Sequence, residues 1–275
     1  MTAPLAAPLA APLAAPLAVA GVRMGRLRVD VLERHSALDA VRRLVEAGRG
    51  GAVFTPNVDH VVMAERHPSF ECAYRRASLT FADGAPIVWA SRLIGPRLPE
   101  KLSGSDMLYP LVRLAAERGW RVYLLGGGPG IAEEAAQRLR AECGVDIVGT
   151  DDAHIKLDDP AADAPVLARI RAARPHLLFV ALGAPKQELW IDQARHALGG
   201  AVAIGVGASL DFVAGKVRRA PAWMSGAGLE WLYRLCQEPR RLWRRYLVQD
   251  PAFVWVAVRA LWRERQRRAA NRRIA

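Results

Sequence analysis

The stretch RVYLLGGGPGIAEEAAQRLRAEC, residues 121–143, decides the fold class of this chain. It begins with a short apolar run, passes through three consecutive glycines and then takes the spacing of an amphipathic helix. The apolar run does not alternate in polarity, which is typical of a strand buried on both faces of a parallel sheet. A buried strand, a glycine turn and a helix together form one unit of an α/β protein.

The same strand-then-helix unit recurs on both sides of this stretch. Strands are predicted at the starts of the segments GAVFTPN, SLTFADG, RVYLLGGGPG, VDIVGTD, HLLFVALGAPK and AVAIGVGASLD. Helical spacing follows in residues 105–119, 129–143 and 186–198. We therefore predict an α/β fold with a mostly parallel, Rossmann-like sheet flanked by helices, followed by a basic helical appendage.

The two ends of the chain differ from this core. The N-terminus repeats APLA four times before the first charge at Arg23. A signal peptide carries its positive charge first, and proline at every fourth residue disfavours a membrane helix, so a low-complexity leader is favoured over a signal or anchor. The predicted division is a leader at residues 1–22, an α/β core at 23–212 and an appendage at 213–275.

The appendage holds nearly all of the excess positive charge. The net charge of the 275-residue chain is +12, and residues 216–275 contain fifteen Lys and Arg against four acids. Five of the eight tryptophans also follow Asp211. Such a segment implies an anionic partner, which is nucleic acid, anionic lipid or phosphate.

A helix lying in a membrane surface accounts best for the end of the appendage. Tryptophan suits the bilayer interface, arginine pairs with anionic headgroups, and one apolar face is expected along the helix. The residues predicted on that face are Phe253, Val254, Ala257, Val258, Leu261 and Trp262. The alternatives are a terminal helix packed on the core with a solvated arginine face and, since no usual nucleic-acid motif is present, more remotely a nucleic-acid-binding tail.

Polar residues follow most of the predicted strands. In parallel sheets ligands bind beyond the carboxyl ends of the strands, so these residues are expected around a single cleft. They are Thr55, Asn57, Asp83, Gly126 to Gly128, Gln187 and Asp211. Asp83 is then either a helix cap or an acid–base group.

Several of the candidate residues have two readings. The glycine turn at residues 126–128 is either a phosphate contact or a tight turn, because it lacks a complete GxGxxG and a following Lys-Ser/Thr. Lys186 at a helix start is either near an anion or on the surface. The connection at residues 93–108 is a candidate lid or binding loop, in which Ser105 or Asp106 either caps the next helix or serves the site.

The sequence predicts no metal site. The acid pairs in TDD and LDDP are interpreted as turn residues, and no HExxH pattern occurs. The three cysteines are not at metal-ligand spacing and indicate a reducing compartment.

Seven segments, taken in order, resemble the WecG/TagA/CpsF family of glycosyltransferases. They are TPNVDHVVMA, ADGAPIVWASRLIG, KLSGSDML, YLLGGGPGIAEEAA, ALGAPKQELWI, GVGASLDFVAGKVRRAPAWMSGAGLEWLYRL and EPRRLWRRYL. The resemblance implies an inverting, metal-independent enzyme with no cofactor. It would move a sugar from a UDP donor, of the N-acetylmannosamine or glucuronate type, onto a polyprenyl-diphosphate-linked saccharide for a bacterial exopolysaccharide or cell-surface polymer.

The resemblance also assigns roles to residues. Asp83 matches the family's proposed base. The substrate-binding residues implied are Thr55, Asn57, Lys101, Asp106, Gly126, Gly127, Lys186, Gln187 and Glu188. Contacts to the lipid diphosphate or the membrane are implied for Arg218, Arg219, Arg234, Arg241, Arg244 and Arg245. The chain departs from the family where Lys101 replaces an arginine and Leu210 replaces a common phenylalanine.

These features together predict the mechanism and the setting of the protein. Asp83 would accept the proton of the acceptor hydroxyl, while amides of the glycine turn, with Lys101 or Arg97, would offset the charge of the leaving diphosphate. The expected location is cytoplasmic, peripheral on the inner face of the plasma membrane, with a possible homo-oligomer and no nucleic-acid partner. The alternative is a non-catalytic nucleotide-binding module with a membrane- or nucleic-acid-binding basic tail.

Overall fold

A computed structural model describes residues 19–159 and 161–274. The predicted leader lies outside the described residues except for its last four positions. The first strand starts at Gly21, two residues before the predicted start of the core.

Within the described residues, the prediction of six strands in one parallel sheet is confirmed. Their order across the sheet is β4-β3-β8-β7-β5-β6, and every neighbouring pair is parallel. The strands are β3 (Gly51–Phe54), β4 (Leu79–Thr80), β5 (Arg121–Gly126), β6 (Asp146–Asp151), β7 (Leu177–Ala181) and β8 (Val202–Gly205). All six carboxyl ends therefore meet at one edge of the sheet.

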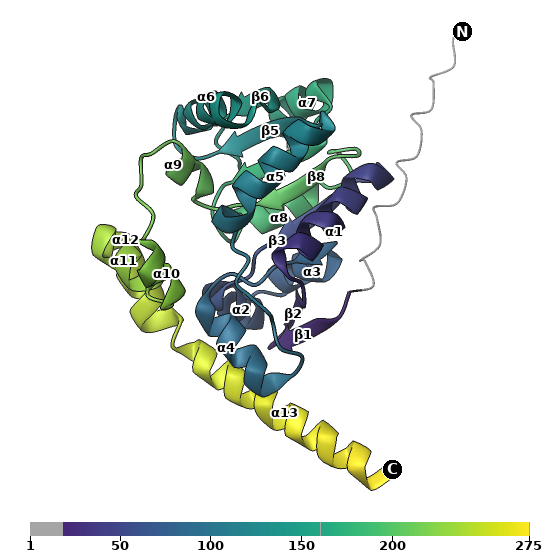
Figure 1. Cartoon of the computed structure of the whole chain (residues 1–275), viewed down its shortest axis with the longest axis vertical. Coiled ribbons are helices and arrows are strands. Elements are labelled where there is room, and N and C mark those ends of the chain that lie inside the picture. The colour runs from purple at the N-terminus through teal and green to yellow at the C-terminus, as the bar shows by residue number, and fades with distance from the viewer. Residues whose placement is uncertain (1–18, 160, 275) are drawn as a thin grey trace.

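Helices cover both faces of this sheet (Figure 1). One layer contains α1 (Arg34–Ala47), α5 (Gly104–Arg118), α6 (Ile131–Cys143) and α9 (Ser209–Val213). The other contains α2 (Val58–Arg66), α3 (Pro68–Arg76), α4 (Ala85–Ile94), α7 (Ala164–Ala173) and α8 (Lys186–Ala194). In β5, Leu124 packs into the first layer and Leu125 into the second, both fully buried. This two-sided burial explains why the strands read as continuous apolar runs.

A two-stranded antiparallel hairpin precedes the sheet, and the sequence interpretation missed it. It consists of β1 (Gly21–Met24) and β2 (Leu27–Asp30), joined at Gly25, which has a positive φ of 60°. The hairpin packs into the second layer. The buried Asp30 carboxylate ties it to the sheet by accepting a 2.8 Å hydrogen bond from the Thr80 N–H.

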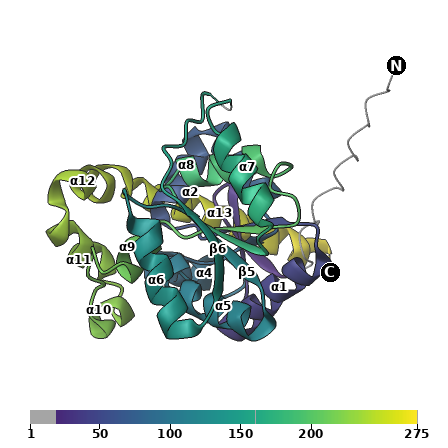
Figure 2. The ribbon, with the colours of Figure 1, turned by 90° about the horizontal axis from the view of Figure 1, so that it is seen from above.

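The predicted helical appendage is confirmed and lies to one side of the α/β body (Figures 1 and 2). It contains α10 (Ala222–Gly226), α11 (Glu230–Gln237), α12 (Pro239–Arg244), a π-helical turn, η1 (Arg245–Gln249), and α13 (Ala252–Ile274). The long α13 crosses beneath α2 and α4 (Figure 1). Across the described part of the chain, none of the helices combines the length and the apolarity that crossing a bilayer requires.

The predicted membrane face of α13 was wrong in its details. Phe253 is buried against the core together with Val256. The apolar side chains left exposed are Val254, Trp255, Val258 and Trp262. The helix therefore has two apolar stripes, because one must bury against α2, α4 and β1 while the other faces outward. The buried stripe agrees with the alternative of a terminal helix packed on the core, and the outward stripe is exposed.

Candidate active site

A cavity of about 810 Å³ lies at the carboxyl edge of the sheet, between the core and the appendage. Thr55 and Asn57 enter it after β3, Asp83 after β4 and Gly127 after β5. The appendage supplies the facing wall. Its main lining residues are Glu230, Trp231, Arg234, Arg241, Arg245 and Tyr246. The structure thus brings together the strand-end residues that the sequence placed around one cleft, with the exception of Gly126.

Asp83 is not a helix cap. The residue at the N-cap of α4 is Gly84, with a φ of 99° and no side-chain capping bond. The Asp83 N–H donates to the Pro56 carbonyl oxygen at 2.9 Å, which fixes the backbone. Among the described residues no group donates a hydrogen bond to its carboxylate, which lines the cavity. The side chain is therefore free to accept a proton from a bound molecule.

Burial raises the pKa of Asp83 to about 6. The positive charge of Lys101 partly opposes this shift, and the negative charges of Glu230 and Asp106 add to it. The sequence interpretation expected the helix start to keep an ordinary, weakly basic carboxylate, but desolvation outweighs that effect. Asp83 is consequently a stronger base than a free aspartate and is still mostly ionised at pH 7.

His60 also lines the cavity, but it is not placed to act as a base. Burial, followed by the charge of Arg245, lowers the pKa of its imidazole to about 3. Its Nδ1 shares a 2.6 Å hydrogen bond with the Tyr74 hydroxyl. His60 therefore stays neutral and is committed to its neighbour.

Three further strand-end side chains are held by local bonds while lining the cavity. Asn57 caps α2 by accepting a bond from the His60 N–H at 3.2 Å, which leaves its amide nitrogen unused. The Thr55 hydroxyl donates to the Gly205 carbonyl oxygen at 3.5 Å, and Gln187 accepts from the Gly207 N–H at 2.9 Å. These bonds fix polar groups from β3, α2 and α8 on one wall.

Two amides in and after the glycine turn are already bonded within the protein. The Gly127 N–H donates to the Ala181 carbonyl oxygen at 2.8 Å, and the Gly130 N–H donates to the Asp152 carboxylate at 2.9 Å. Asp152 thus lies at the start of α6, where an anion was expected. Gly126, with a φ of 99°, does not line the cavity, and a Cβ there would lie 2.5 Å from the Ala181 oxygen. Gly126 therefore serves close packing and not substrate contact.

Lys101 reaches the cavity but is already paired. Its Nζ lies 2.9 Å from a Glu230 carboxylate oxygen and 3.3 Å from one of Asp106, and it donates to the Ser225 hydroxyl at 3.2 Å. Asp106 also pairs with Arg219. The cluster joins the start of α5 to α10 and α11. Lys101, Asp106 and Arg219, predicted as substrate or lipid contacts, instead hold the appendage on the core in this structure.

The helix cap in this region is Ser103. Its hydroxyl accepts from the Asp106 N–H, and the Asp106 carboxylate accepts from the Ser103 N–H, which forms a capping box. Of the two residues considered as caps, Asp106 takes part in this capping box, whereas Ser105 does not cap the helix.

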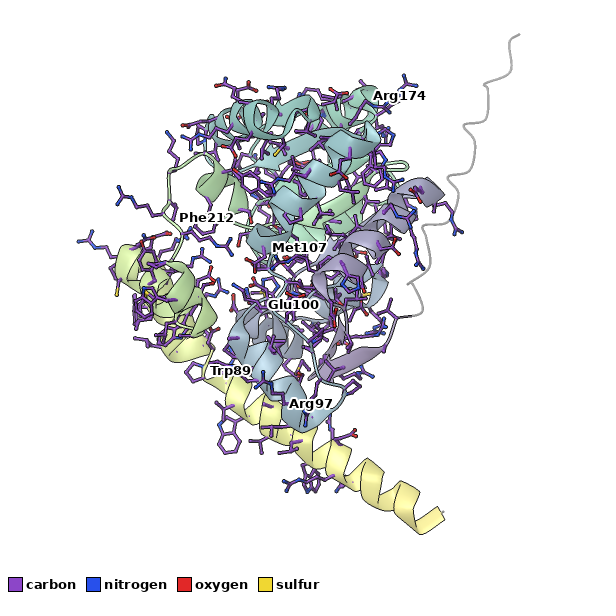
Figure 3. All side chains as sticks on the ribbon, in the orientation of Figure 1. Trp89, Arg97, Glu100, Met107, Arg174 and Phe212 are labelled. Carbon is purple, nitrogen blue, oxygen red and sulfur yellow. The ribbon has the colours of Figure 1, made fainter. Side chains whose placement is uncertain are left out.

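Arg234 is the cavity-lining arginine whose charge no carboxylate pairs within the described residues. Arg245 pairs with Asp59 at 3.1 Å and Arg241 with Glu238 at 2.6 Å. The Arg234 guanidinium instead lies over the Phe212 ring, 5.9 Å from its centroid, and its buried Nε has no hydrogen-bond partner. Figure 3 shows Phe212 on the side of the core that faces the appendage. Arg234 is thus the side chain best prepared to meet an anion.

The remaining predicted contacts lie outside the cavity. Lys186 is partly exposed at the start of α8, and Arg218 and Arg244 are exposed. Arg97 is exposed and lies well away from Phe212 (Figure 3). Glu188 is fully buried and does not reach the cavity. Within the described residues no cluster of three or more His, Cys, Asp or Glu side chains is arranged for a metal ion.

Sequence reasoning missed several residues of the facing wall. Glu230, Trp231 and Tyr246 line the cavity but are about 150 residues from Asp83 in the chain. The only signal for them was their position in segments that resemble the family. Their side chains reach the site because the appendage folds back over the strand ends.

The sheet and its carboxyl-edge cavity define an α/β protein in which the Asp83 carboxylate and the Arg234 guanidinium line one cavity. A model of the glycosyl transferase WecG/TagA/CpsF family matches residues 22–267, so the chain belongs to that family, as its seven segments predicted. It is 34% identical over 204 residues to the N-acetylglucosaminyldiphosphoundecaprenol N-acetyl-beta-D-mannosaminyltransferase of Bacillus spizizenii. That match covers 74% of this chain and 77% of the relative. The chain is a glycosyltransferase of cell-surface polymer synthesis.

Proposed function

We propose that this chain transfers N-acetylmannosamine from its UDP derivative onto N-acetylglucosaminyl-diphosphoundecaprenol. The sugar and the acceptor are those in the name of the Bacillus spizizenii relative. The observation that carries the chemistry is the unpaired Asp83 carboxylate, which shares one cavity with the unpaired Arg234. A base and a cation on opposite walls are the two groups that a direct sugar transfer requires.

In the proposed reaction, Asp83 takes the proton of the acceptor hydroxyl as its oxygen bonds to the anomeric carbon. The bond from that carbon to the UDP oxygen breaks at the same time, and the electron pair leaves with the diphosphate. Arg234 offsets the charge that develops there. A single displacement with one base inverts the anomeric centre, so an α-linked donor gives a β-linked product. The name of the relative specifies a β-linked mannosaminyl group.

The proposed enzyme uses no metal ion, because the guanidinium of Arg234 supplies the positive charge at the leaving group. Asn57 and Gln187 would orient the donor through the amide atoms that their local bonds leave unused. Lys101 would join them if a bound diphosphate displaced Glu230 from it.

The exposed apolar side chains of α4 and the appendage suit a lipid-linked acceptor. Within the described residues, the exposed large apolar side chains lie only on α4 or between residues 223 and 262. They are Trp89, Leu93, Trp223, Trp231, Leu232, Trp243, Leu247, Val248, Val254, Trp255, Val258 and Trp262. Exposed apolar side chains concentrated in these segments indicate an interaction surface, and tryptophan beside arginine suits an anionic bilayer better than nucleic acid. We infer a peripheral site on the inner face of the plasma membrane.

The test is transfer by the purified chain in the presence of EDTA. With UDP-N-acetylmannosamine and N-acetylglucosaminyl-diphosphoundecaprenol in anionic vesicles, we expect a β-linked disaccharide lipid and a rate that EDTA does not change. UDP-glucuronate is the matched alternative donor. Transfer from UDP-glucuronate but not from UDP-N-acetylmannosamine would replace the proposed donor. UDP binding without transfer or hydrolysis of any UDP-sugar would support the non-catalytic nucleotide-binding module instead.

A further inference from the structure

Glu188 is a fully buried carboxylic acid that the proposed chemistry does not use. It lies in the first turn of α8, next to Gln187, with no exposed surface. The sequence interpretation placed it in contact with substrate, which its burial contradicts. Since a buried carboxyl group is costly unless it forms hydrogen bonds, its presence needs an explanation.

The bonds of the neighbouring Gln187 supply one. Its Nε2 donates to Glu188 Oε1 at 2.8 Å, and its Oε1 accepts from the Gly207 N–H at 2.9 Å. An amide has two N–H groups and two acceptor positions, and these two bonds use one of each. They also exclude the flipped amide, which would bring Nε2 against an N–H and Oε1 against a carboxyl oxygen. Gln187 lines the cavity although it is only 3% exposed.

The Gln187 amide also packs closely on Gly205, the last residue of β8. A Cβ at this position would lie 2.3 Å from Gln187 Nε2. The absent side chain of Gly205 thus provides the space in which the amide lies. The carboxamide thus packs on a glycine of β8 and donates a hydrogen bond to a carboxyl group of α8.

We propose that Glu188 is a positioning residue, which holds the Gln187 carboxamide in the one orientation that presents its second N–H and second acceptor position to the sugar-nucleotide donor. This inference rests on the proposed function, because it requires that Gln187 contact the donor.

The positioning role does not need a negative charge. Burial raises the pKa of Glu188 to about 7, and its Oε2 has no hydrogen-bond partner within the described residues. Oε1 accepts the Gln187 bond as a carboxylate oxygen and equally as the carbonyl oxygen of the neutral acid. A glutamine at position 188 keeps that acceptor, whereas methionine removes it at similar volume.

The test is a double-mutant cycle measured on the proposed transfer reaction. We expect Glu188→Met to lower kcat/KM about tenfold, the size of one lost hydrogen bond, and Glu188→Gln to stay within about twofold of wild type. In the Gln187→Ala background, Glu188→Met should have no further effect. Thermal unfolding of each variant shows whether it is folded.

Gly205→Ala gives an independent arm that leaves Glu188 in place, for the case in which Glu188→Met does not fold. Its added methyl group should displace the Gln187 amide and lower kcat/KM to a similar degree. In the Gln187→Ala background, Gly205→Ala should lower kcat/KM no further. The proposal is overturned if folded Glu188→Met has wild-type kcat/KM, if Glu188→Gln loses as much as Glu188→Met, or if the losses persist in the Gln187→Ala background.

The proposed function fails in a different way. If wild type transfers no sugar, the donor or acceptor is wrong. If wild type transfers sugar and Gln187→Ala is fully active, Gln187 does not contact the donor and the positioning role falls with it, while the role of Asp83 stands.

Discussion

Asp83 combines two properties that a structural aspartate does not need. It is desolvated enough for its pKa to rise to about 6, yet no group among the described residues satisfies its carboxylate. An unpaired, partly desolvated carboxylate destabilises the folded state and is typical of a functional site. The two consequences, for catalysis and for stability, can be measured separately.

The first prediction concerns the pH dependence of transfer. Since the ionised carboxylate is the base, kcat/KM should rise with pH through about 6 and level off above it. At pH 5 the rate should be about tenfold below the plateau. A kcat/KM that does not change between pH 5 and pH 8 contradicts the assignment, as does an unchanged acidic limb in Asp83→Asn.

The second prediction concerns stability. The pKa of Asp83 is raised in the folded state above its ordinary 3.8, so its stabilising contribution is full below 3.8 and is lost as pH rises through about 6. The uncharged Asp83→Asn should therefore match wild type in free energy of unfolding at pH 3.5 and exceed it at pH 8 by up to about 3 kcal/mol. Urea unfolding at the two pH values measures this, and an equal or lower stability at pH 8 contradicts it.

The third prediction concerns Arg234. Its unpaired guanidinium should stabilise the leaving diphosphate, so Arg234→Ala should lower kcat about 10²-fold. Arg240→Ala is the matched control, because Arg240 is exposed on α12 outside the cavity and should keep wild-type kcat. Equal losses of kcat in both variants would mean that the overall positive charge of the appendage, and not Arg234 in particular, supports transfer.

Sequence reasoning at this scale found the residues that directly follow strands. Asp83, Thr55 and Asn57 reach the cavity because parallel strands end at one edge. It did not distinguish Gln187 from Glu188, which are neighbours in the first turn of α8. Which of them faces the cavity depends on how that helix is rotated against β8, and this rotation follows from packing.

At the scale of elements, the sequence analysis missed the short β1–β2 hairpin and gave helix α13 one apolar face where it has two. The strands β1 and β2 show an alternation of buried and exposed positions on either side of Gly25, with Val22, Met24, Leu27 and Val29 buried. This pattern is typical of a hairpin, but the sequence analysis did not use it. The apolar residues of α13 divide between two stripes, so a single face was predicted where two exist. The six sheet strands were predictable because each is buried on both faces.

The fourth prediction tests the outward stripe of α13. Trp255→Ser/Trp262→Ser should weaken binding to anionic vesicles by about tenfold or more, since each tryptophan would lose apolar burial at the interface. Transfer to a short-chain, water-soluble acceptor should be unchanged. Arg113→Ser/Glu117→Ser, exposed on α5, is the control for surface change. Undiminished vesicle binding by the tryptophan variant in a cosedimentation assay would place the membrane contact elsewhere.

At the scale of the whole molecule, the cavity is lined jointly by the strand ends of the core and by the appendage. The core contributes Asp83 and the appendage contributes Arg234, so base and cation come from opposite walls. The sequence predicted both parts but not which arginines would face inward. Arg218 and Arg244 point elsewhere while Arg234 lines the cavity, and that choice depends on how α10 to α12 pack.

The central claim is that Asp83 is the base of sugar transfer in this cavity. The most direct measurement compares Asp83→Asn with wild type for turnover of UDP-N-acetylmannosamine and, by calorimetry, for UDP binding. We predict that kcat falls about 10²–10⁴-fold while the Kd for UDP stays within about twofold, because the amide keeps the shape of the carboxylate but cannot take the proton. Turnover near the wild-type rate in a folded, UDP-binding Asp83→Asn protein would contradict the account.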